Sequence, residues 1–211
     1  AYLNQHPDVQ CVRSVAYYFN PETGERAAAD EKRGDLKRER LFWDVLESRT
    51  FVCCGCYMLR SEAFFAIYPG GKIPVSFVGQ NFQMLLPFLY RHACPTIRRE
   101  LYGVAVRAGS HSRRPLDQAQ TEEKYREYER LVDEIVDLCG MTDRSERRRI
   151  KRWKLRRRLE LAFLYRQYGR GLSTCACLAA LGEKGTARLA LALGRMRLAE
   201  TGPGRLWRRL R

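Results

Sequence analysis

The feature that most constrains the fold is the point along the chain where extended segments stop. Short apolar runs, typical of strands, occur at residues 9–19, 50–58, 73–78 and 97–106, with helical patterns between them. After residue 116 the apolar residues recur only at helical spacing, and no segment repeats. This order predicts an α/β fold, a mixed sheet with flanking helices, followed by a purely helical part.

The basic charge is confined to the C-terminal third of the sequence. Residues 144–211 hold 20 of the 39 Lys and Arg residues but only 4 of the 24 Asp and Glu residues, so the rest of the chain is close to neutral. The net charge of +15 therefore describes an appendage, and it is not a nucleic-acid footprint over the whole fold. We expect a domain at 1–115, an amphipathic helix within 116–143 that packs on it, and a basic helical extension at 144–211.

Cysteine content and hydropathy indicate a cytoplasmic protein. Eight cysteines in 211 residues are too sparse for a disulfide scaffold, so we expect reduced and mostly buried thiols. Cys53 and Cys56 have C-x-x-C spacing but no matching second pair, which favours structural thiols over a zinc site. The first 20 residues lack the pattern of a signal peptide, and no apolar stretch reaches the ~18 residues that span a bilayer.

The stretch from Gly79 to Ser112 contains the residue types that hold a phosphorylated or hydroxyl-rich ligand. At the start of an apolar helix stand Gly79, Gln80, Asn81 and Gln83. Amides there either cap the free backbone N–H groups of the helix or bind ligand hydroxyls and phosphate oxygens. Arg107 and His111 flank a Gly-Ser loop, where they are either solvated or neutralise a phosphate, Arg107 in bidentate fashion.

Four segments, in this order, resemble the second half of a family-2 glycosyltransferase with the GT-A fold. They are YLNQHPDV (2–9), CYMLRSEA (56–63), GQNFQMLLP (79–87) and LYGVAVRAGSHS (101–112). The resemblance implies a partial GT-A, Rossmann-like sheet for residues 1–115. It also implies an inverting transfer of a sugar from a nucleotide-sugar donor to a glycan or lipid-linked acceptor, in the biosynthesis of cell-surface polysaccharide.

The resemblance also implies roles for individual residues. Gln80 and Asn81 occupy the place of the family's catalytic acidic motif, although an amide cannot accept a proton from a sugar hydroxyl at neutral pH. The base must then come from elsewhere, or the chain is not catalytic. The acceptor is expected beside Cys54 and Gly55, facing the helix that starts at Phe82. The substrate-binding set implied by the resemblance is Cys54, Gly55, Gly79, Gln83, Arg107, Ser110 and His111.

A divalent metal, Mg²⁺ or Mn²⁺, is implied for the whole enzyme, with His111 as its candidate ligand in this chain. The family's Asp-x-Asp motif and its first nucleotide-binding half would precede Ala1. We therefore expect a fragment that by itself neither binds a nucleotide tightly nor turns over. The alternative is a non-catalytic, membrane-peripheral interaction module that lost the catalytic carboxylate.

The basic helix predicted at 145–168 leaves three interpretations open. Trp153 and its apolar neighbours, among nine basic residues in 147–158, suit a helix lying on an anionic membrane surface. Such a helix would place the protein peripherally on the inner face of the membrane. A nucleic-acid arm accounts for the charge but not for the apolar residues. A packing helix with a solvated basic face accounts for both.

Overall fold

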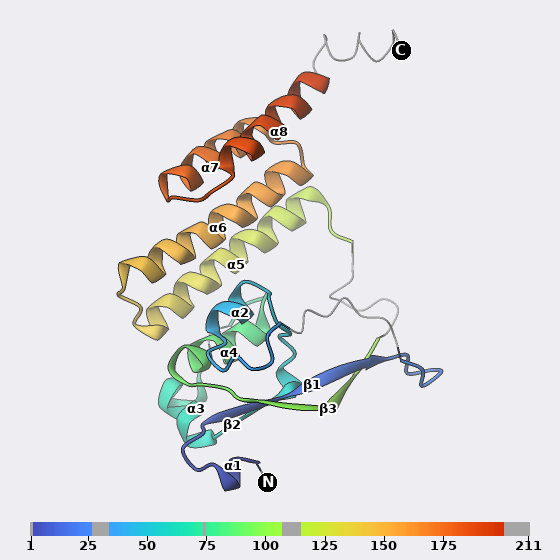
Figure 1. Cartoon of the computed structure of the whole chain (residues 1–211), viewed down its shortest axis with the longest axis vertical. Helices are drawn as coiled ribbons and strands as arrows, with labels where there is room; N and C mark the ends of the chain where they lie inside the picture. The colour runs from blue at the N-terminus through green and yellow to red at the C-terminus, as the bar shows by residue number, and fades with distance from the viewer. Residues whose placement is uncertain (1, 27–33, 74, 107–114, 201–211) are drawn as a thin grey trace. The chain divides into compact units, whose positions relative to one another are not determined.

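The structure is a computed structural model, and it describes residues 2–26, 34–73, 75–106 and 115–200 (Figure 1). Within these residues the protein is a mixed α/β protein with eight α-helices and one three-stranded sheet, as the sequence predicts at this level. The chain divides into two compact units. The first comprises residues 1–116 and 130–140, and the second comprises residues 117–129 and 141–211.

The first unit is built on a sheet with the strand order β2-β1-β3. The central strand β1 (Cys11–Phe19) pairs antiparallel with β2 (Tyr57–Leu59) and parallel with β3 (Thr96–Ala105). The first six residues of β1 are buried on both faces, which is why this segment reads as a nearly continuous apolar run. Irregular pairing with β3 on either side of Val15 marks a bulge in the middle of the strand.

The apolar run at 50–58 is not the single buried strand that the sequence predicts. Only its end is extended, in β2, and the 3-10 turn η1 (Cys54–Cys56) precedes it. No strand forms among the described residues of 73–78 either. Phe51 and Cys56 are buried beside Ala16 of β1, so the apolar composition of 50–58 reports burial and not extended backbone.

The helices that lie wholly in the first unit are short, except α4. They are α1 (Tyr2–Gln5), α2 (Phe42–Leu46), α3 (Ser61–Ile67), the 3-10 turn η2 (Pro69–Gly71) and α4 (Gln80–Arg91). Helix α2 starts at Phe42. It packs against α4, with the rings of Phe42 and Tyr90 in edge-on contact at 5.2 Å. Figure 1 shows α2 and α4 on the same side of the sheet.

Pro87 lies inside α4, and Tyr68 compensates for it. Proline has no N–H, so the carbonyl of Gln83, four residues earlier, has no helical donor from that position. The buried Tyr68 hydroxyl donates a hydrogen bond to this carbonyl oxygen. Burial raises the pKa of Tyr68, which keeps the hydroxyl protonated as a donor. The helix therefore continues through the proline to Arg91.

The second unit is entirely helical in its described residues. It contains the first part of α5 (Gln118–Cys139), then α6 (Arg144–Leu164), α7 (Tyr168–Ala180) and α8 (Thr186–Glu200). The Asp143 carboxylate caps α6 by accepting hydrogen bonds from the backbone N–H groups of Ser145 and Glu146. Gly182 and Gly185, with φ of +77° and +80°, separate α7 from α8 where the sequence alone predicts one weakened helix.

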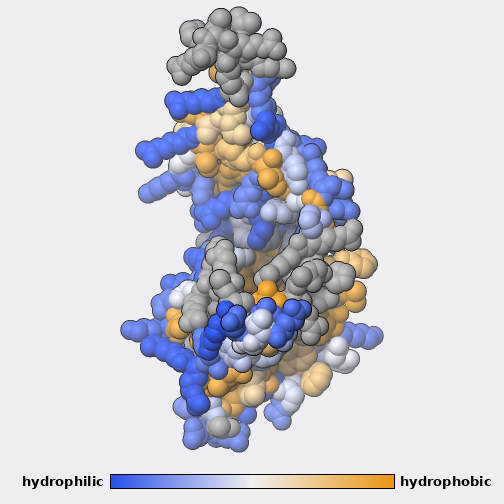
Figure 2. All heavy atoms as spheres, turned by 90° about the vertical axis from the view of Figure 1, so that its right-hand side faces the viewer, coloured by the Kyte–Doolittle hydropathy of each residue, from blue (hydrophilic) through white to orange (hydrophobic). Residues whose placement is uncertain are grey.

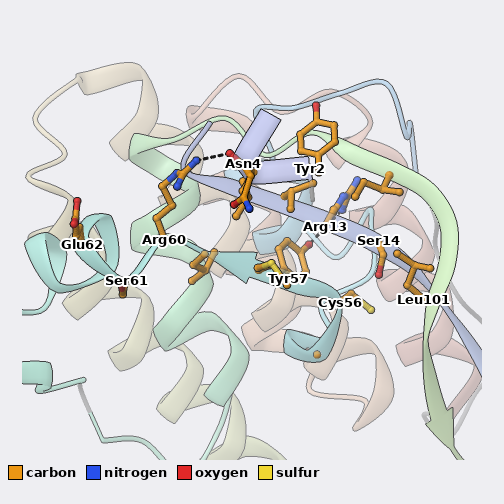
Figure 3. Close-up of a pocket in the computed structure, with 16 residues that line it drawn as sticks. Tyr2, Asn4, Arg13, Ser14, Cys56, Tyr57, Arg60, Ser61, Glu62 and Leu101 are labelled. Atoms are coloured by element: carbon orange, nitrogen blue, oxygen red, sulfur yellow. Dashed lines mark hydrogen bonds between the residues drawn. The ribbon is translucent and has the colours of Figure 1, made fainter. Parts of the chain in front are cut away.

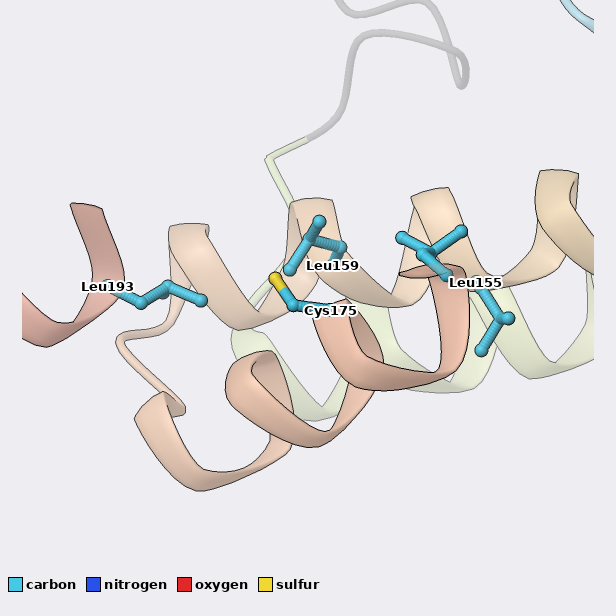
Figure 4. Packing of buried hydrophobic residues seen from close by; sticks show 5 residues of the cluster. Leu155, Leu159, Cys175 and Leu193 are labelled. Atoms are coloured by element: carbon cyan, nitrogen blue, oxygen red, sulfur yellow. The ribbon is translucent and has the colours of Figure 1, made fainter. Parts of the chain in front are cut away.

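The core of the second unit is shared by α6, α7 and α8 (Figure 4). It consists of Leu155, Leu159, Cys175, Leu178 and Leu193. Gly171 lets α8 come close to α7, since a Cβ at this position would lie 2.6 Å from Cδ1 of Leu193. The leucines of α6 that the sequence shows among arginines are therefore part of a packed interior.

Candidate functional site

A cavity of about 670 Å³ lies in the first unit, bordered by α1, β1 and the segment that runs from η1 into α3 (Figure 3). This volume suits a small phosphorylated metabolite. Its lining combines aromatic, hydroxyl, amide and charged side chains, which include those of Tyr2, Asn4, Arg13, Ser14, Tyr57, Arg60, Ser61 and Glu62. This mixture differs from the purely apolar lining of a packing defect.

Arg13 is the most unusual residue in this lining. It stands near the start of β1 and is only 1% exposed. Its Nε donates to Oγ1 of Thr96 at 2.9 Å, and its Nη1 donates to Oγ1 of Thr50 at 2.9 Å and to the Tyr57 hydroxyl at 3.3 Å. The guanidinium also lies over the ring of Phe51, 4.5 Å from its centroid. These contacts hold the side chain in one place.

None of these partners neutralises the charge of Arg13. Within the described part of the chain, no carboxylate lies within ion-pair distance of its guanidinium, and its buried Nη2 has no hydrogen-bond partner. A buried cation without a counter-charge costs several kcal/mol in desolvation. A buried arginine that lines a cavity in this state is suited to an anionic ligand, which would supply both the charge and the acceptor.

Arg60 lines the same cavity but is already used by the backbone. Its Nε donates to the carbonyl of Val9 at 2.8 Å, and its Nη2 donates to the carbonyls of Leu3 at 2.6 Å and His6 at 3.3 Å. Figure 3 shows this side chain reaching back toward α1. Arg60 therefore fixes the segment after α1 against the start of α3 and shapes the cavity.

Glu62 is the one carboxylate among the described residues that line the cavity. It lies in the first turn of α3. Its side chain is exposed, so it is free to accept a proton from a ligand hydroxyl.

Gly55, a predicted binding residue, lines the cavity, and the structure gives a packing reason for it as well. A Cβ at Gly55 would lie 2.1 Å from Cζ of Tyr102, so the tyrosine ring occupies the space that a side chain would need. Its predicted partner Cys54 is half-buried, and burial raises the pKa of its thiol to about 11, with a further contribution from Cys53. Cys54 is therefore a neutral thiol at physiological pH.

The cysteines as a group are free thiols, and most are buried, as predicted. Five are buried and only Cys177 is exposed. The sulfur atoms of Cys11 and Cys94 lie 2.9 Å apart between β1 and the segment that precedes β3. The hydrogen bond between them, and then burial, raise the pKa of Cys11 far above its usual range.

The described amides at the start of α4, those of Asn81 and Gln83, neither cap the helix nor line this cavity. The N-cap is Gly79, with a left-handed φ of +61°, and no side chain caps the helix. Asn81 is half-buried, while Gln83 is 6% exposed and its Nε2 has no hydrogen-bond partner. The side chain of Gln80 lies outside what the structure describes. The acceptor site was predicted between α4 and residues 54–57. Gly55, Cys56 and Tyr57 line the cavity, whereas no described residue of α4 is part of its lining.

The second predicted cluster, Arg107, Ser110 and His111, lies outside the described residues, so its position relative to Gly79 is not given by the structure. Across the described ranges, no group of three or more His, Cys, Asp or Glu side chains could hold a metal ion. The divalent metal implied by the resemblance therefore has no fitting ligand set in that part of the chain.

Sequence reasoning missed Arg13, Glu62, Tyr2 and Asn4. One signal for Arg13 was available, because a lone arginine inside the apolar run CVRSVAYYF is rarely buried without a purpose. The others carry no such signal. Tyr2 and Asn4 reach the cavity only because Arg60 draws the segment after α1 toward α3.

The structure also locates the basic helix predicted at 145–168. Most apolar residues of α6 are buried, although Leu164 at its end is exposed. Trp153 is only 6% exposed, with the Arg157 guanidinium 4.8 Å from the centroid of its ring. The basic side chains of α6 face outward in many positions, for example Arg148 and Lys151. Among the described helices, none is both long and apolar enough to cross a membrane.

Comparison of the chain with known proteins gives no family, no curated protein and no solved structure that matches it.

Proposed function

We propose that this chain is the acceptor-side part of a family-2 glycosyltransferase with a partial GT-A fold, and that the cavity beside Arg13 holds a phosphorylated carbohydrate. The observation that carries the proposal is the buried guanidinium of Arg13, which lines a cavity of about 670 Å³ and has neither a carboxylate partner nor an acceptor for Nη2 within the described residues. A phosphate oxygen would satisfy both needs.

The distribution of the resembling segments supports this assignment. Three of the four contribute to the cavity, Tyr2 and Asn4 from the first, Cys56 to Glu62 from the second, and Leu101 from the last. These segments are far apart in sequence and meet around a single ligand-sized space. The described residues of the remaining segment, GQNFQMLLP (79–87) at the start of α4, do not line the cavity.

The side chains around the cavity can divide the work of binding a sugar phosphate. The guanidinium of Arg13 pairs with phosphate, the ring faces of Tyr2 and Tyr57 cover the apolar face of a sugar, and Asn4, Ser14 and Ser61 supply hydrogen bonds to its hydroxyls. This division follows the chemistry of a ligand with one anionic end and several hydroxyl groups.

In the proposed reaction, Glu62 accepts the proton of an acceptor hydroxyl as its oxygen attacks the anomeric carbon of the donor sugar. The bond between that carbon and the diphosphate oxygen breaks, and the nucleoside diphosphate leaves with the electron pair. Arg13 stabilises the charge that develops on the phosphate.

The test is binding of glucose 1-phosphate, compared with glucose and inorganic phosphate, to the wild-type chain and to Arg13→Met. We expect the sugar phosphate to bind more tightly than either part alone, and we expect Arg13→Met to weaken it at least tenfold, because charge-assisted hydrogen bonds are each worth about 1.5–3 kcal/mol. Calorimetry gives the affinities.

The matched control is Arg99→Met, which removes the same charge from an exposed position on β3 and should leave the affinity unchanged. Thermal unfolding with and without the sugar phosphate identifies a folded protein, because only a folded, binding chain is stabilised by its ligand. Equal binding by the wild type and a folded Arg13→Met variant, or no preference for the sugar phosphate, would refute the proposed site.

A second candidate function is the non-catalytic, membrane-peripheral module. The observation in its favour is that the start of α4 carries amides where the resembling family has its acidic motif. Glu62→Gln distinguishes the two functions. If the chain belongs to an enzyme, this change abolishes sugar transfer by the complete protein while glucose 1-phosphate still binds. If it belongs to a module, there is no transfer to abolish.

A further inference from the structure

Helix α8 carries a solvent-exposed face on which leucines and arginines alternate. On the opposite side, Leu193 is fully buried in the core of the second unit. The exposed face is formed by Arg188, Leu191, Arg195 and Leu198, at successive spacings of three, four and three residues. These spacings place all four side chains along one stripe of the helix. We call this stripe the α8 face.

The two leucines of the α8 face are more exposed than a packed surface requires, at 64% for Leu191 and 65% for Leu198. They lie one above the other, seven residues apart. Figure 2 shows apolar side chains beside long hydrophilic ones on the surface of the helical unit. Exposed leucines at this spacing on a helix mark a contact surface rather than a solvated one.

The arginines of the α8 face do not pair within the second unit. Among the described residues, no carboxylate lies within ion-pair distance of Arg188 or Arg195. Glu200, the one acidic residue of α8, pairs with Arg166 of the α6–α7 connection instead. Both guanidinium groups are therefore available to an external anion.

The combination selects one occupant. Leucines that enter an apolar layer, with arginines whose long stems reach back to negative headgroups, match the chemistry of an anionic lipid surface. A second copy of the chain fits poorly, since both α8 faces carry positive charge and would repel each other. A nucleic acid would use the arginines but not the leucines.

We propose that the α8 face docks the protein on an anionic lipid bilayer. This inference does not depend on the proposed sugar site, which lies in the other unit. It places the membrane contact on α8 and not on α6, for which the sequence leaves a membrane helix as one of three interpretations. In α6, Trp153 and the leucines other than Leu164 are buried, whereas Leu191 and Leu198 of α8 are exposed.

The test is cosedimentation of the full chain with vesicles of phosphatidylcholine, with or without phosphatidylglycerol. We expect binding only to the anionic vesicles, and weaker binding at higher salt. The double variant Leu191→Ser with Leu198→Ser should bind at least about tenfold more weakly, because it removes the two apolar side chains that enter the lipid. Arg188→Gln with Arg195→Gln should also lose about tenfold or more, because each arginine near an anionic surface contributes severalfold.

Two controls match these variants. Arg144→Gln with Arg148→Gln removes the same charge from exposed positions of α6, and Val75→Ser with Phe77→Ser removes exposed apolar groups from the first unit. Both should bind as the wild type does. Circular dichroism confirms that each variant is folded, as expected for substitutions of exposed side chains.

Three outcomes would overturn the proposal. The first is an equal loss of binding in the α6 control, which would show attraction by overall basic charge. The second is unchanged binding of the Leu191→Ser, Leu198→Ser variant to anionic vesicles. That result would show attraction by charge alone, as for a polyanion such as RNA, without insertion of the leucines. The third is the absence of binding to anionic vesicles.

Discussion

At the scale of single residues, two buried polar side chains in the first unit are held for different reasons. The Tyr68 hydroxyl completes a helix, because it donates to the Gln83 carbonyl that Pro87 leaves without a helical donor. Arg13 is fixed by hydrogen bonds to Thr50, Thr96 and Tyr57, but its charge is not neutralised by any described residue. The first arrangement serves stability, whereas the second is costly for stability and suited to binding.

Replacing Tyr68 by Phe should lower the free energy of unfolding by about 1–3 kcal/mol, because a buried carbonyl loses its donor. Urea unfolding measures the change. The informative comparison is the same substitution combined with Pro87→Ala, which restores the backbone N–H to α4. In that background the cost of Tyr68→Phe should become much smaller. Equal costs in both backgrounds would show that the hydroxyl acts in another way.

His92 predicts a pH dependence in the same unit. Burial, and then the charges of Arg91 and Arg40, lower the pKa of His92 below its usual 6.5 in the folded state. The unfolded chain therefore binds the proton more readily. The stability linked to His92 is complete well above pH 6.5 and is lost as the pH falls through 6.5 toward the lower folded pKa.

Urea unfolding at about pH 8 and about pH 5 should show this loss in the wild type. The variant His92→Gln, which cannot titrate, should lose less stability between the two pH values. An unchanged pH dependence in the variant would remove His92 as the cause.

At the scale of elements, the sequence predicted the secondary structure of long segments whose apolar residues recur with a regular spacing. The prediction was wrong for a short apolar run without such a spacing. Strands β1 and β3 and helices α4 and α5 lie close to where apolar spacing placed them. Residues 50–58 form a turn and the start of a short strand. Their apolar side chains, among them Phe51 and Cys56, are buried although the backbone that carries them is not extended. The break between α7 and α8 depends on two glycines with left-handed φ, and propensity alone only weakens a helix there.

Gly55 gives a prediction about the η1 turn. Gly55→Ala should destabilise the first unit by about 1–3 kcal/mol, because the new methyl group would overlap the Tyr102 ring. The second substitution Tyr102→Ala removes that ring and should recover most of the loss added by the alanine at position 55. Thermal unfolding of the four proteins in this cycle checks both statements. A cost that stays the same without the ring would rule out the steric explanation.

At the scale of the whole molecule, each unit has an apolar cluster of its own. The apolar cluster of the second unit contains only residues of α6, α7 and α8, and the cluster around Phe51 belongs to the first unit. Composition predicted a neutral body with a basic helical extension, and it could predict this because charge is read directly from sequence. It could not predict the cavity, which depends on Arg60 joining segments that are far apart in the chain.

Separate apolar clusters predict local effects of a core substitution. Leu178→Ala should destabilise the second unit by about 2–5 kcal/mol, because Leu178 is buried at the centre of its cluster. Hydrogen exchange followed by mass spectrometry should show faster exchange in α6, α7 and α8 and unchanged exchange in β1 and β3. Equal acceleration in the sheet would show that the two units unfold as one.

If the cavity beside Arg13 binds the proposed anion, the buried cation near the start of β1 has a consequence for the life of the protein in the cell. An unfilled cavity leaves the first unit with a penalty that a bound anion removes, so the filled form unfolds less often than the empty one. Proteases act on unfolded chains, and the amount of protein at steady state would then follow the supply of its metabolite. Cells starved of that metabolite would hold less of the protein at the same rate of synthesis.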